Sequence, residues 1–435
     1  MRVRGVVYKA GAGWAGPPQA TQAATGHIMP AEIHFRVERR HTPRSFISAA
    51  CRPFRAMERV VSVIIVLIAL SVGAVASPNG GRPGDEPRGK PFSYLHDQIS
   101  TVPWSVHVLK LDRTSPEYEL DSVLAKGTII GMESLADQMK SYPTNIGRPV
   151  GAINGDFYRN DGDPEGIQVC HGELVSAPSG RACFWIDAIG NPHGDEIQSL
   201  FRVIWPSGAG IRIGLNEERA KDAVVLYTPK MGPTSRTSGG REFLLEADDP
   251  NQWLPLRIST RFKAKIREIR ETGNAPLRPG QMVLSVGPNV LSQVPKLNPG
   301  DTIEISTATL PDMRDCKTAI GGGPRLVVDR KPVGGWRSPN ERHPRTAVGW
   351  NDDYIFLVMV DGRQPGLSMG MSFTELADYF VKLGCTQAVN LDGGGSASMW
   401  LFGQTVSSPS EGRERPIANG LTVVKKNRDA VHLDD

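Results

Sequence analysis

Residues 354–396 read YIFLVMVDGRQPGLSMGMSFTELADYFVKLGCTQAVNLDGGGS, and they contain the strongest secondary-structure signals of the chain. Residues 354–360 form an uninterrupted apolar run, which is typical of a strand buried on both faces. Residues 387–391 (QAVNL) form a second short apolar run. The pattern therefore predicts two strands joined by the segment between them.

The segment between the two runs has the pattern of a capped helix. Ser372 and Glu375 have the spacing of a capping box, in which each side chain bonds the backbone amide of the other residue. Leu376 and Phe380 lie on one face of such a helix, and Gly384 suits its C-terminal end. We therefore expect strand, helix and strand in succession.

A strand, a helix and a strand in succession predict a βαβ unit with parallel strands. Both strands then end at the same edge of the sheet. The first strand ends in Asp361-Gly362-Arg363 and the second in residues 390–396. Ligands of open α/β sheets bind beyond the carboxyl ends of the strands, so two polar, glycine-rich turns are expected to meet at one place.

The rest of the chain has shorter signals. Alternating patterns predict strands at 105–111 and 118–123, and a compact apolar run predicts another at 149–153. A short helix is expected within 132–142. Residues of about 200–310 contain short β-like runs between Gly/Pro turns, and we interpret them as a β-rich inserted subdomain.

The N-terminal part has the features of an export signal. Residues 57–76 carry a basic flank, an apolar run and Ala74-Val75-Ala76, a site at which signal peptidase could cut before Ser77. An uncleaved membrane anchor is the alternative, although the run is short for a span. We expect residues 1–56 to precede the true start at Met57 or to be disordered, and residues 77–103 to form a linker.

The domain itself is expected over 104–428, followed by a polar tail at 429–435. The net charge is +4 for the whole chain. Residues 1–56 carry +7 of it, which leaves −3 for residues 57–435. A nucleic-acid-binding domain would need basic residues gathered on one surface, so nucleic acid is not expected as a partner.

Beyond the signal, the four cysteines allow two disulfides or four thiols, and they lack zinc-site spacing.

Four clusters of residues could carry chemistry. Taken singly, each has a structural explanation, such as glycine in turns, arginine in surface ion pairs, or Asn and Asp at strand ends. The clusters are Asn154–Tyr158 (NGDFY), Ala319–Pro324 (AIGGGP), Arg342–Gly349 (RHPRTAVG), and the strand ends with Asp361, Arg363, Asn390 and Asp392.

In this order, the clusters resemble the pattern of the phosphodiester glycosidase family over roughly residues 105–425. The resemblance implies an α+β fold, here with a mixed sheet core, a C-terminal βαβ unit and the β-rich inserted subdomain. It also implies hydrolysis of a sugar-1-phosphodiester, which contains N-acetylglucosamine for a vertebrate member. Bacterial relatives are expected to act on envelope or exopolysaccharide sugar phosphates.

The residue types suit this chemistry. Glycoside hydrolysis usually employs two carboxylates, and we predict Asp156 and Asp392 as the catalytic pair, as nucleophile or water-activating base. A phosphate leaving group calls for a cationic clamp, for which Arg345 and Arg363 are the candidates. His343 is a possible acid, although a single histidine here is more often structural.

The other substrate-binding candidates are Asn154, Asn390, Gly393, Gly394 and Ser396. The asparagines can bind sugar hydroxyls or orient the carboxylates, and the glycines allow backbone amides to approach an anion. We expect six side chains to line one concave site: Asn154, Asp156, Arg345, Arg363, Asn390 and Asp392.

No cofactor is required by these residues, although a divalent cation is possible. Residues 160–165 (NDGDPE) are acidic like calcium loops but lack EF-hand spacing, so a solvated turn is favoured.

Two other functions remain open. One is a non-catalytic phosphoglycan-binding envelope protein. The other is a phosphodiesterase acting at phosphorus, which would normally show a richer His/Asp metal cluster. In either case, contact with a membrane is expected only through an uncleaved signal.

Overall fold

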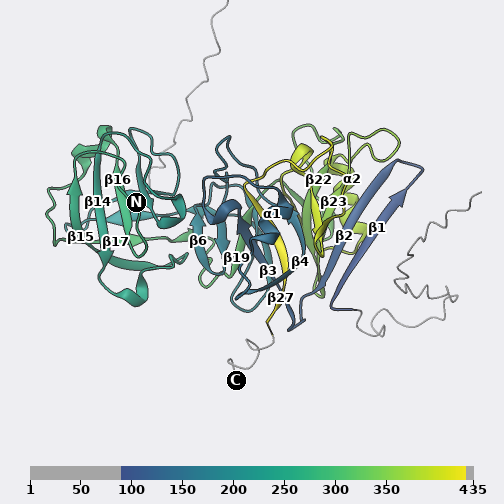
Figure 1. The fold of residues 1–435 in the computed structure, drawn as a ribbon, viewed down its shortest axis with the longest axis horizontal. Coiled ribbons are helices and arrows are strands. Elements are labelled where there is room, and N and C mark those ends of the chain that lie inside the picture. Colours follow the sequence, from purple (N-terminus) through teal and green to yellow (C-terminus); the bar gives the residue numbers. More distant parts are fainter. Residues whose placement is uncertain (1–89, 428–435) are drawn as a thin grey trace, which may run out of the picture. The chain divides into compact units, whose positions relative to one another are not determined.

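The computed structural model describes residues 90–427 (Figure 1). The expected signal at 57–76, the segment 1–56 and the tail at 429–435 lie outside the described residues. The described part consists mainly of β-sheets, with two α-helices, α1 (Leu135–Lys140) and α2 (Phe373–Lys382). The coarse α+β expectation agrees with this, although helices are a small part of the fold.

The central sheet has seven strands, and every neighbouring pair in it is antiparallel. Figure 1 shows its first strands beside α2. The order is β1 (Phe92–Ile99), β2 (Trp104–Asp112), β23 (Tyr354–Val360), β22 (Arg345–Trp350), β24 (Gln387–Asn390), β20 (Arg325–Val328) and β21 (Lys331–Pro332).

Both faces of β23 are buried, as its apolar run predicts. Leu357 and Met359 pack into one hydrophobic cluster, while Phe356 and Val358 pack into another. The second cluster includes Leu376 and other residues of α2. The alternation follows from the two-residue period of a strand, and it places the helix on one face of the sheet.

The predicted helix cap is confirmed. The Glu375 amide donates to Ser372 Oγ at 3.2 Å, and the Ser372 amide donates to Glu375 Oε2 at 2.9 Å. Gly384 follows the helix with a φ of +81°, a conformation that favours glycine. Local sequence signals therefore define this helix at both ends.

The predicted mixed sheet and the parallel pairing of the βαβ unit need correction. β23 and β24 do not pair, because β22 lies between them and is antiparallel to both. The two strands still run in the same direction and end at one edge of the sheet. Residues 345–350, which from the sequence indicate only part of a functional motif, are all buried and form the central strand.

Two five-stranded sheets also surround the site. The first has the order β26 (Gln404–Thr405), β25 (Met399–Leu401), β4 (Gly147–Asn154), β27 (Asn419–Lys426) and β3 (Tyr118–Leu124). The second has the order β6 (Glu173–Ser176), β5 (Gln168–Cys170), β19 (Thr318–Gly321), β7 (Ala182–Ile186) and β8 (Pro192–Glu196). Residues of both sheets share a core with the central sheet, including Ile153, Phe184 and Leu357.

Residues 202–306 form an eight-stranded sheet, drawn in teal and green in Figure 1. Its order is β11 (Gly210–Arg212), β10 (Arg202–Ile204), β17 (Thr302–Ser306), β15 (Arg261–Arg270), β14 (Arg241–Ala247), β16 (Met282–Val286), β13 (Val224–Tyr227) and β12 (Gly214–Leu215). A two-stranded sheet joins β18 (Thr309–Leu310) to β9 (Gln198–Ser199).

Within residues 90–427, five 3-10 helices connect these elements: η1 (Ala125–Gly127), η2 (Pro229–Met231), η3 (Pro250–Gln252), η4 (Pro288–Gln293) and η5 (Gly394–Ser396). Among the described residues, no helix combines the length and apolar character needed to span a membrane. The four cysteines of the described part are unpaired: Cys170, Cys183, Cys316 and Cys385.

The predicted linker at 77–103 ends earlier than expected. From Phe92 to Ile99 the chain forms β1, which pairs with β2 along its whole length. The Gly/Pro-rich composition stops at Pro91, and the residues that follow can all take part in a ladder of hydrogen bonds. Regular structure therefore begins about a dozen residues before the predicted domain boundary.

Candidate active site

One edge of the central sheet gathers the predicted motifs. At this edge β22 begins at Arg345, β23 is followed by Asp361, and β24 is followed by Leu391 and Asp392. The turn after β4 is bonded to the same place, because the Asp392 amide donates to the Gly155 carbonyl at 2.9 Å. Residues more than 230 positions apart in the chain therefore meet.

A cavity of about 390 Å³ opens at this edge. Predicted residues lining it include Arg345, Arg363, Asn390 and Asp392, together with Gly393 and Gly394. Asn154 and Asp156 are not among the lining residues, contrary to the expectation that all six side chains line one surface. The remaining lining residues are Phe157, His343, Phe373, Leu391, Gly395 and Arg415.

Asn154 is buried, and its side chain bonds the protein itself. Its Oδ1 accepts from Thr346 Oγ1 at 2.6 Å and from the Ser398 amide at 3.0 Å. Its Nδ2 donates to the Asp392 carbonyl at 2.7 Å. The amide therefore orients the Asp392 segment, and a sugar hydroxyl would have to displace one of these bonds.

Asp156 is 1% exposed and lies away from the cavity surface. Its Oδ1 accepts from the Phe157 amide at 2.8 Å, whereas Oδ2 is buried without a hydrogen-bond partner. Oδ2 faces Gly166 and Gly321, where an added Cβ would collide with it. Burial raises the pKa of Asp156 to about 7, although Arg181, 4.0 Å from Oδ1, opposes that shift.

Asp392 is half-buried and lines the cavity directly. Its Oδ1 accepts from the Gly393 amide at 2.8 Å, which fixes the side chain against its own turn. Burial raises the pKa of Asp392, while Ser396, the Gly393 amide and Arg415 partly offset the shift. A carboxylate held in this way is placed rigidly yet faces an open space.

Arg345 is fixed by the protein rather than by a carboxylate. Its Nε donates to the Met371 carbonyl at 2.9 Å and its Nη2 to the Glu341 carbonyl at 2.8 Å. Its guanidinium lies 4.0 Å from the centre of the Phe373 ring. Burial and the neighbouring charge of Arg363 lower the pKa of Arg345 to about 10.

Arg363 is exposed and has a positive φ of 59°. Its Nη2 lies 3.3 Å from His343 Nδ1, and its guanidinium packs over Gly394, where an added Cβ would lie 3.2 Å from Nη2. Within residues 90–427, neither Arg345 nor Arg363 forms an ion pair with a carboxylate. Two adjacent guanidinium groups without an acidic partner form a site suited to an anion.

Glycine is required in the turn that follows Asp392. Gly394 has a φ of +59°, and an added Cβ at Gly393 would lie 2.7 Å from the Pro344 carbonyl oxygen. Ser396 is buried, and its hydroxyl lies 3.4 Å from Tyr158 Oη, so it supports the turn. Asn390 donates from Nδ2 to the Gly323 and Leu391 carbonyls, and its buried Oδ1 has no partner.

Sequence reasoning missed several residues at this site. Arg415 and Phe373 line the cavity, and Arg181 lies beside Asp156 with its guanidinium 4.5 Å from the centre of the Phe157 ring. Phe373 could have been found, because it is the first residue of the capped helix. Arg415 and Arg181 lie in irregular segments without a distinctive motif, so nothing local indicates their position.

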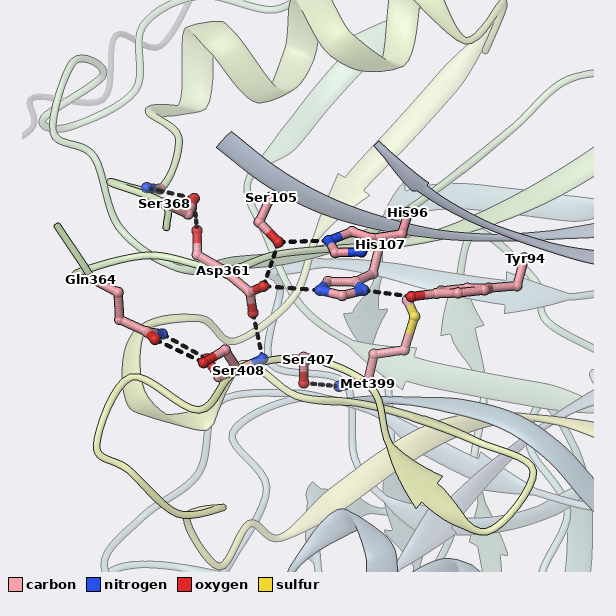
Figure 2. Close-up of polar contacts among 11 residues, drawn as sticks. Tyr94, His96, Ser105, His107, Asp361, Gln364, Ser368, Met399, Ser407 and Ser408 are labelled. Carbon is pink, nitrogen blue, oxygen red and sulfur yellow. Dashed lines mark hydrogen bonds and ion pairs between the residues drawn. The ribbon is translucent and has the colours of Figure 1, made fainter. Parts of the chain in front are cut away.

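One group in residues 90–427 has the spacing of metal ligands, and Figure 2 shows it. Ligand atoms of His96, His107 and Asp361 lie within 4.8 Å of one another. Protein groups already bond them, since Asp361 Oδ2 lies 2.7 Å from Ser105 Oγ and 2.9 Å from His107 Nε2, and His96 Nε2 lies 2.8 Å from Ser105 Oγ. The two rings also stack with centroids 4.2 Å apart. Hydrogen bonding within the protein therefore accounts for this group.

The acidic loop at 160–165 does not form such a group. Asp163 is 5% exposed and lies 3.5 Å from Arg159 Nη1. Burial raises its pKa to about 7, and neighbouring carboxylates, including Asp161, add to the shift. The exposure of Asp161 and Glu165 agrees with the favoured solvated turn, whereas Asp163 is buried.

The comparison with known proteins agrees with the motifs. Residues 264–424 match the family model described as phosphodiester glycosidase. The matched segment includes β22, β23, α2 and β24, which position the cavity. The resemblance to this family is therefore confirmed for the part of the chain that carries most of the predicted site.

Two curated relatives and one solved structure show how far the similarity extends. An uncharacterized SPbeta prophage-derived protein of Bacillus subtilis is 32% identical over 115 residues, which is 25% of this chain and 18% of that protein. N-acetylglucosamine-1-phosphodiester alpha-N-acetylglucosaminidase of Bos taurus is 40% identical over 68 residues, which is 15% of this chain and 12% of that enzyme.

A hypothetical protein from Synechocystis has a similar fold, with a TM-score of 0.61 and 21% identity. That similarity covers 77% of this chain and 62% of the other. The chain matches less than a fifth of the length of each curated relative. These comparisons support the fold and the family resemblance, while activity and substrate are matters for proposal.

Proposed function

We propose that this protein is a hydrolase that cleaves the bond between the anomeric carbon of a sugar and the oxygen of a phosphodiester. The observation that carries the proposal is the arrangement of Arg345 and Arg363 beside the half-buried Asp392 in one cavity. Arginine binds phosphate oxygens through two parallel hydrogen bonds. Among residues 90–427, no carboxylate forms an ion pair with either of these guanidinium groups.

The proposed reaction needs little help for its leaving group. When the carbon–oxygen bond breaks, the phosphate monoester leaves with the bonding electrons and is stable as an anion. Water supplies the hydroxyl group that the anomeric carbon gains, and the proton of that water passes to a base. Positive charge develops on the sugar ring during this step, and a nearby carboxylate stabilises it.

We assign the direct catalytic role to Asp392, as nucleophile or as water-activating base. Of the two predicted aspartates only Asp392 lines the cavity. Asp156 takes a supporting role as a buried carboxyl group near Asp392. The two segments are joined because the Gly155 carbonyl accepts a hydrogen bond from the Asp392 amide. Asn154 orients the same turn through the Asp392 carbonyl.

For the substrate we propose a sugar-1-phosphodiester of the cell envelope or of an exopolysaccharide, with N-acetylglucosamine as the first sugar to test. The name of the bovine relative supports this choice, because it is an N-acetylglucosamine-1-phosphodiester glycosidase. We further propose that the protein is exported, which the sequence of residues 57–76 supports. Mass spectrometry of the exported protein should find Ser77 at its N-terminus. Peptides from residues 1–50 would contradict both this cleavage and a translation start at Met57.

The direct test incubates the purified protein with synthetic sugar-1-phosphodiesters and follows release of the free sugar. Neutral aryl glycosides and sugar-1-phosphate monoesters serve as comparison substrates. We expect turnover of the phosphodiesters above all. Tight binding of them without turnover, over a range of pH and with divalent cations added, would instead support a non-catalytic phosphoglycan-binding protein.

A further inference from the structure

A third arginine lies over the glycine turn of the candidate site. Arg415 lines the cavity with Arg345 and Arg363, and its guanidinium packs against Gly395, where an added Cβ would collide with it. Burial raises the pKa of Asp392, and the positive charge of Arg415 offsets part of that rise. Arg415 is therefore close to both groups that the proposed reaction requires, the anion site and the carboxylate.

Unlike the other two arginines, Arg415 has a carboxylate partner. Its Nη2 forms an ion pair with Glu411 Oε1, and its Nε lies 3.4 Å from Glu411 Oε2. The Glu411 carboxylate also packs against Gly395. Both oxygens of Glu411 thus face one guanidinium at the cavity wall, in the bidentate arrangement that a phosphate group would adopt.

The segment that carries this pair is fixed at its start by a partly buried hydrogen-bond network, which Figure 2 shows. The Ser408 amide donates to Asp361 Oδ1 at 2.8 Å. Gln364 Nε2 donates to the Ser408 carbonyl at 2.8 Å, and Ser408 Oγ donates to Gln364 Oε1 at 2.7 Å. Asp361 is itself 1% exposed and bonded to Ser105 and His107.

The end of the segment is fixed as well. Ile417 forms two backbone hydrogen bonds with Glu133, at 2.8 and 3.1 Å, and the Pro416 carbonyl accepts from Tyr158 Oη at 3.1 Å. Residues 408 and 416–417 are therefore anchored, and the Glu411–Arg415 pair lies between the two anchors. Its place over the glycine turn follows from these contacts.

The ion pair itself is easily exchanged. The side chains of Arg415 and Glu411 are 40% and 44% exposed. Ion pairs with this exposure contribute little to stability, because water screens the charges and both side chains lose freedom when they pair. An anion that enters the cavity could therefore replace Glu411 at a small cost, while Arg415 keeps its place on Gly395.

We propose that Arg415 is a third phosphate-binding residue, and that Glu411 occupies its guanidinium until the phosphate group of a ligand replaces it. This inference rests on the proposed function and names a residue pair that sets ligand specificity. Phosphate esters can replace the Glu411 carboxylate on Arg415, whereas neutral glycosides offer no group that can do so. Glu411 thus lowers the affinity for every anion and disfavours those that are weak ligands of arginine.

The test measures binding of inorganic phosphate by calorimetry, which needs no turnover. Glu411→Gln should bind phosphate about two- to fivefold more tightly than the parent, the range expected for removing one exposed ion pair. Arg415→Gln should bind it about tenfold more weakly, as for loss of a charged hydrogen bond. The double variant should show no gain over Arg415→Gln.

Glu341→Gln is the matched control. It also removes a carboxylate near the cavity, because Glu341 Oε2 lies 3.5 Å from Nε2 of the lining residue His343. The ion pair of Arg415 is formed with Glu411 and not with Glu341. The inference is overturned if Glu411→Gln gains no more affinity than this control, if its gain persists without Arg415, or if it binds no phosphate. Hydrolysis by the parent tests the proposed function separately. If Glu411→Gln binds phosphate more tightly but the parent hydrolyses no substrate, only the proposed function is contradicted.

Discussion

Replacing Asp156 by asparagine should change how the stability of the protein depends on pH. The carboxylate of Asp156 is almost fully buried and one of its oxygens has no hydrogen-bond partner. Its pKa is raised by burial to about 7 from an ordinary value of 3.8. The folded state therefore keeps this proton over a pH range in which the unfolded state has already lost it.

The sign follows from the proton count. Between about pH 4 and pH 7 the folded state binds one more proton at Asp156 than the unfolded state, so stability falls as the pH rises. The difference between the ordinary pKa of 3.8 and the raised pKa of about 7 corresponds to about 4 kcal/mol. This loss of stability has not begun below about pH 4 and is complete above about pH 7.

The assay is denaturant unfolding of the parent and of Asp156→Asn at several pH values from 4 to 8. Asparagine keeps the oxygen that accepts from Phe157, and it cannot ionise. The free energy of unfolding of the parent should fall by about 4 kcal/mol more than that of the variant across this range. Titration of Asp163 is common to both proteins and cancels. Parallel curves would refute the burial argument for Asp156.

Two further substitutions test the roles assigned at the cavity. Arg345→Lys should lower kcat/KM on phosphodiesters about 10- to 100-fold, because an ammonium group cannot form the two parallel hydrogen bonds of the planar guanidinium group. Its kcat/KM on neutral aryl glycosides should be nearly unchanged. Equal losses on both substrates would show that Arg345 does not bind the phosphate group. Asp392→Asn should have the Tm of the parent and still bind substrate, but its turnover should fall by about 10²- to 10⁴-fold, as for loss of a general base. Substantial remaining turnover would show that Asp392 is structural and would assign the catalytic role to Asp156.

Much of the central sheet and of the site edge could be predicted, because the signals there are local. The apolar run at 354–360 indicates a strand buried on both faces, and Ser372, Glu375 and Gly384 define the ends of α2. The edge position of Asp361 and Asp392 follows from the common direction of β23 and β24. This edge position does not depend on direct pairing of β23 and β24. Because β22 lies between them and is antiparallel to both, the two strands still run in the same direction.

Strand pairing and depth of burial could not be predicted, because both depend on residues far apart in the chain. Residues 345–350 lack the alternation of a half-buried strand, since all six are buried. The burial of Asp156 depends on Gly166 and Gly321, which close over it from two other segments. The position of Arg415 depends on contacts of Ser408 with Asp361 and Gln364.

Hydrolysis in water enriched in heavy oxygen shows whether the enzyme breaks the carbon–oxygen or the phosphorus–oxygen bond. If the bond between the anomeric carbon and oxygen is broken, water attacks carbon, and the label should appear on the released sugar. A phosphodiesterase would attack phosphorus and place the label on the phosphate. Mass spectrometry of both products distinguishes these outcomes. Label on the sugar alone is the predicted result, and label on the phosphate would contradict the assignment of this cavity to glycosidic cleavage.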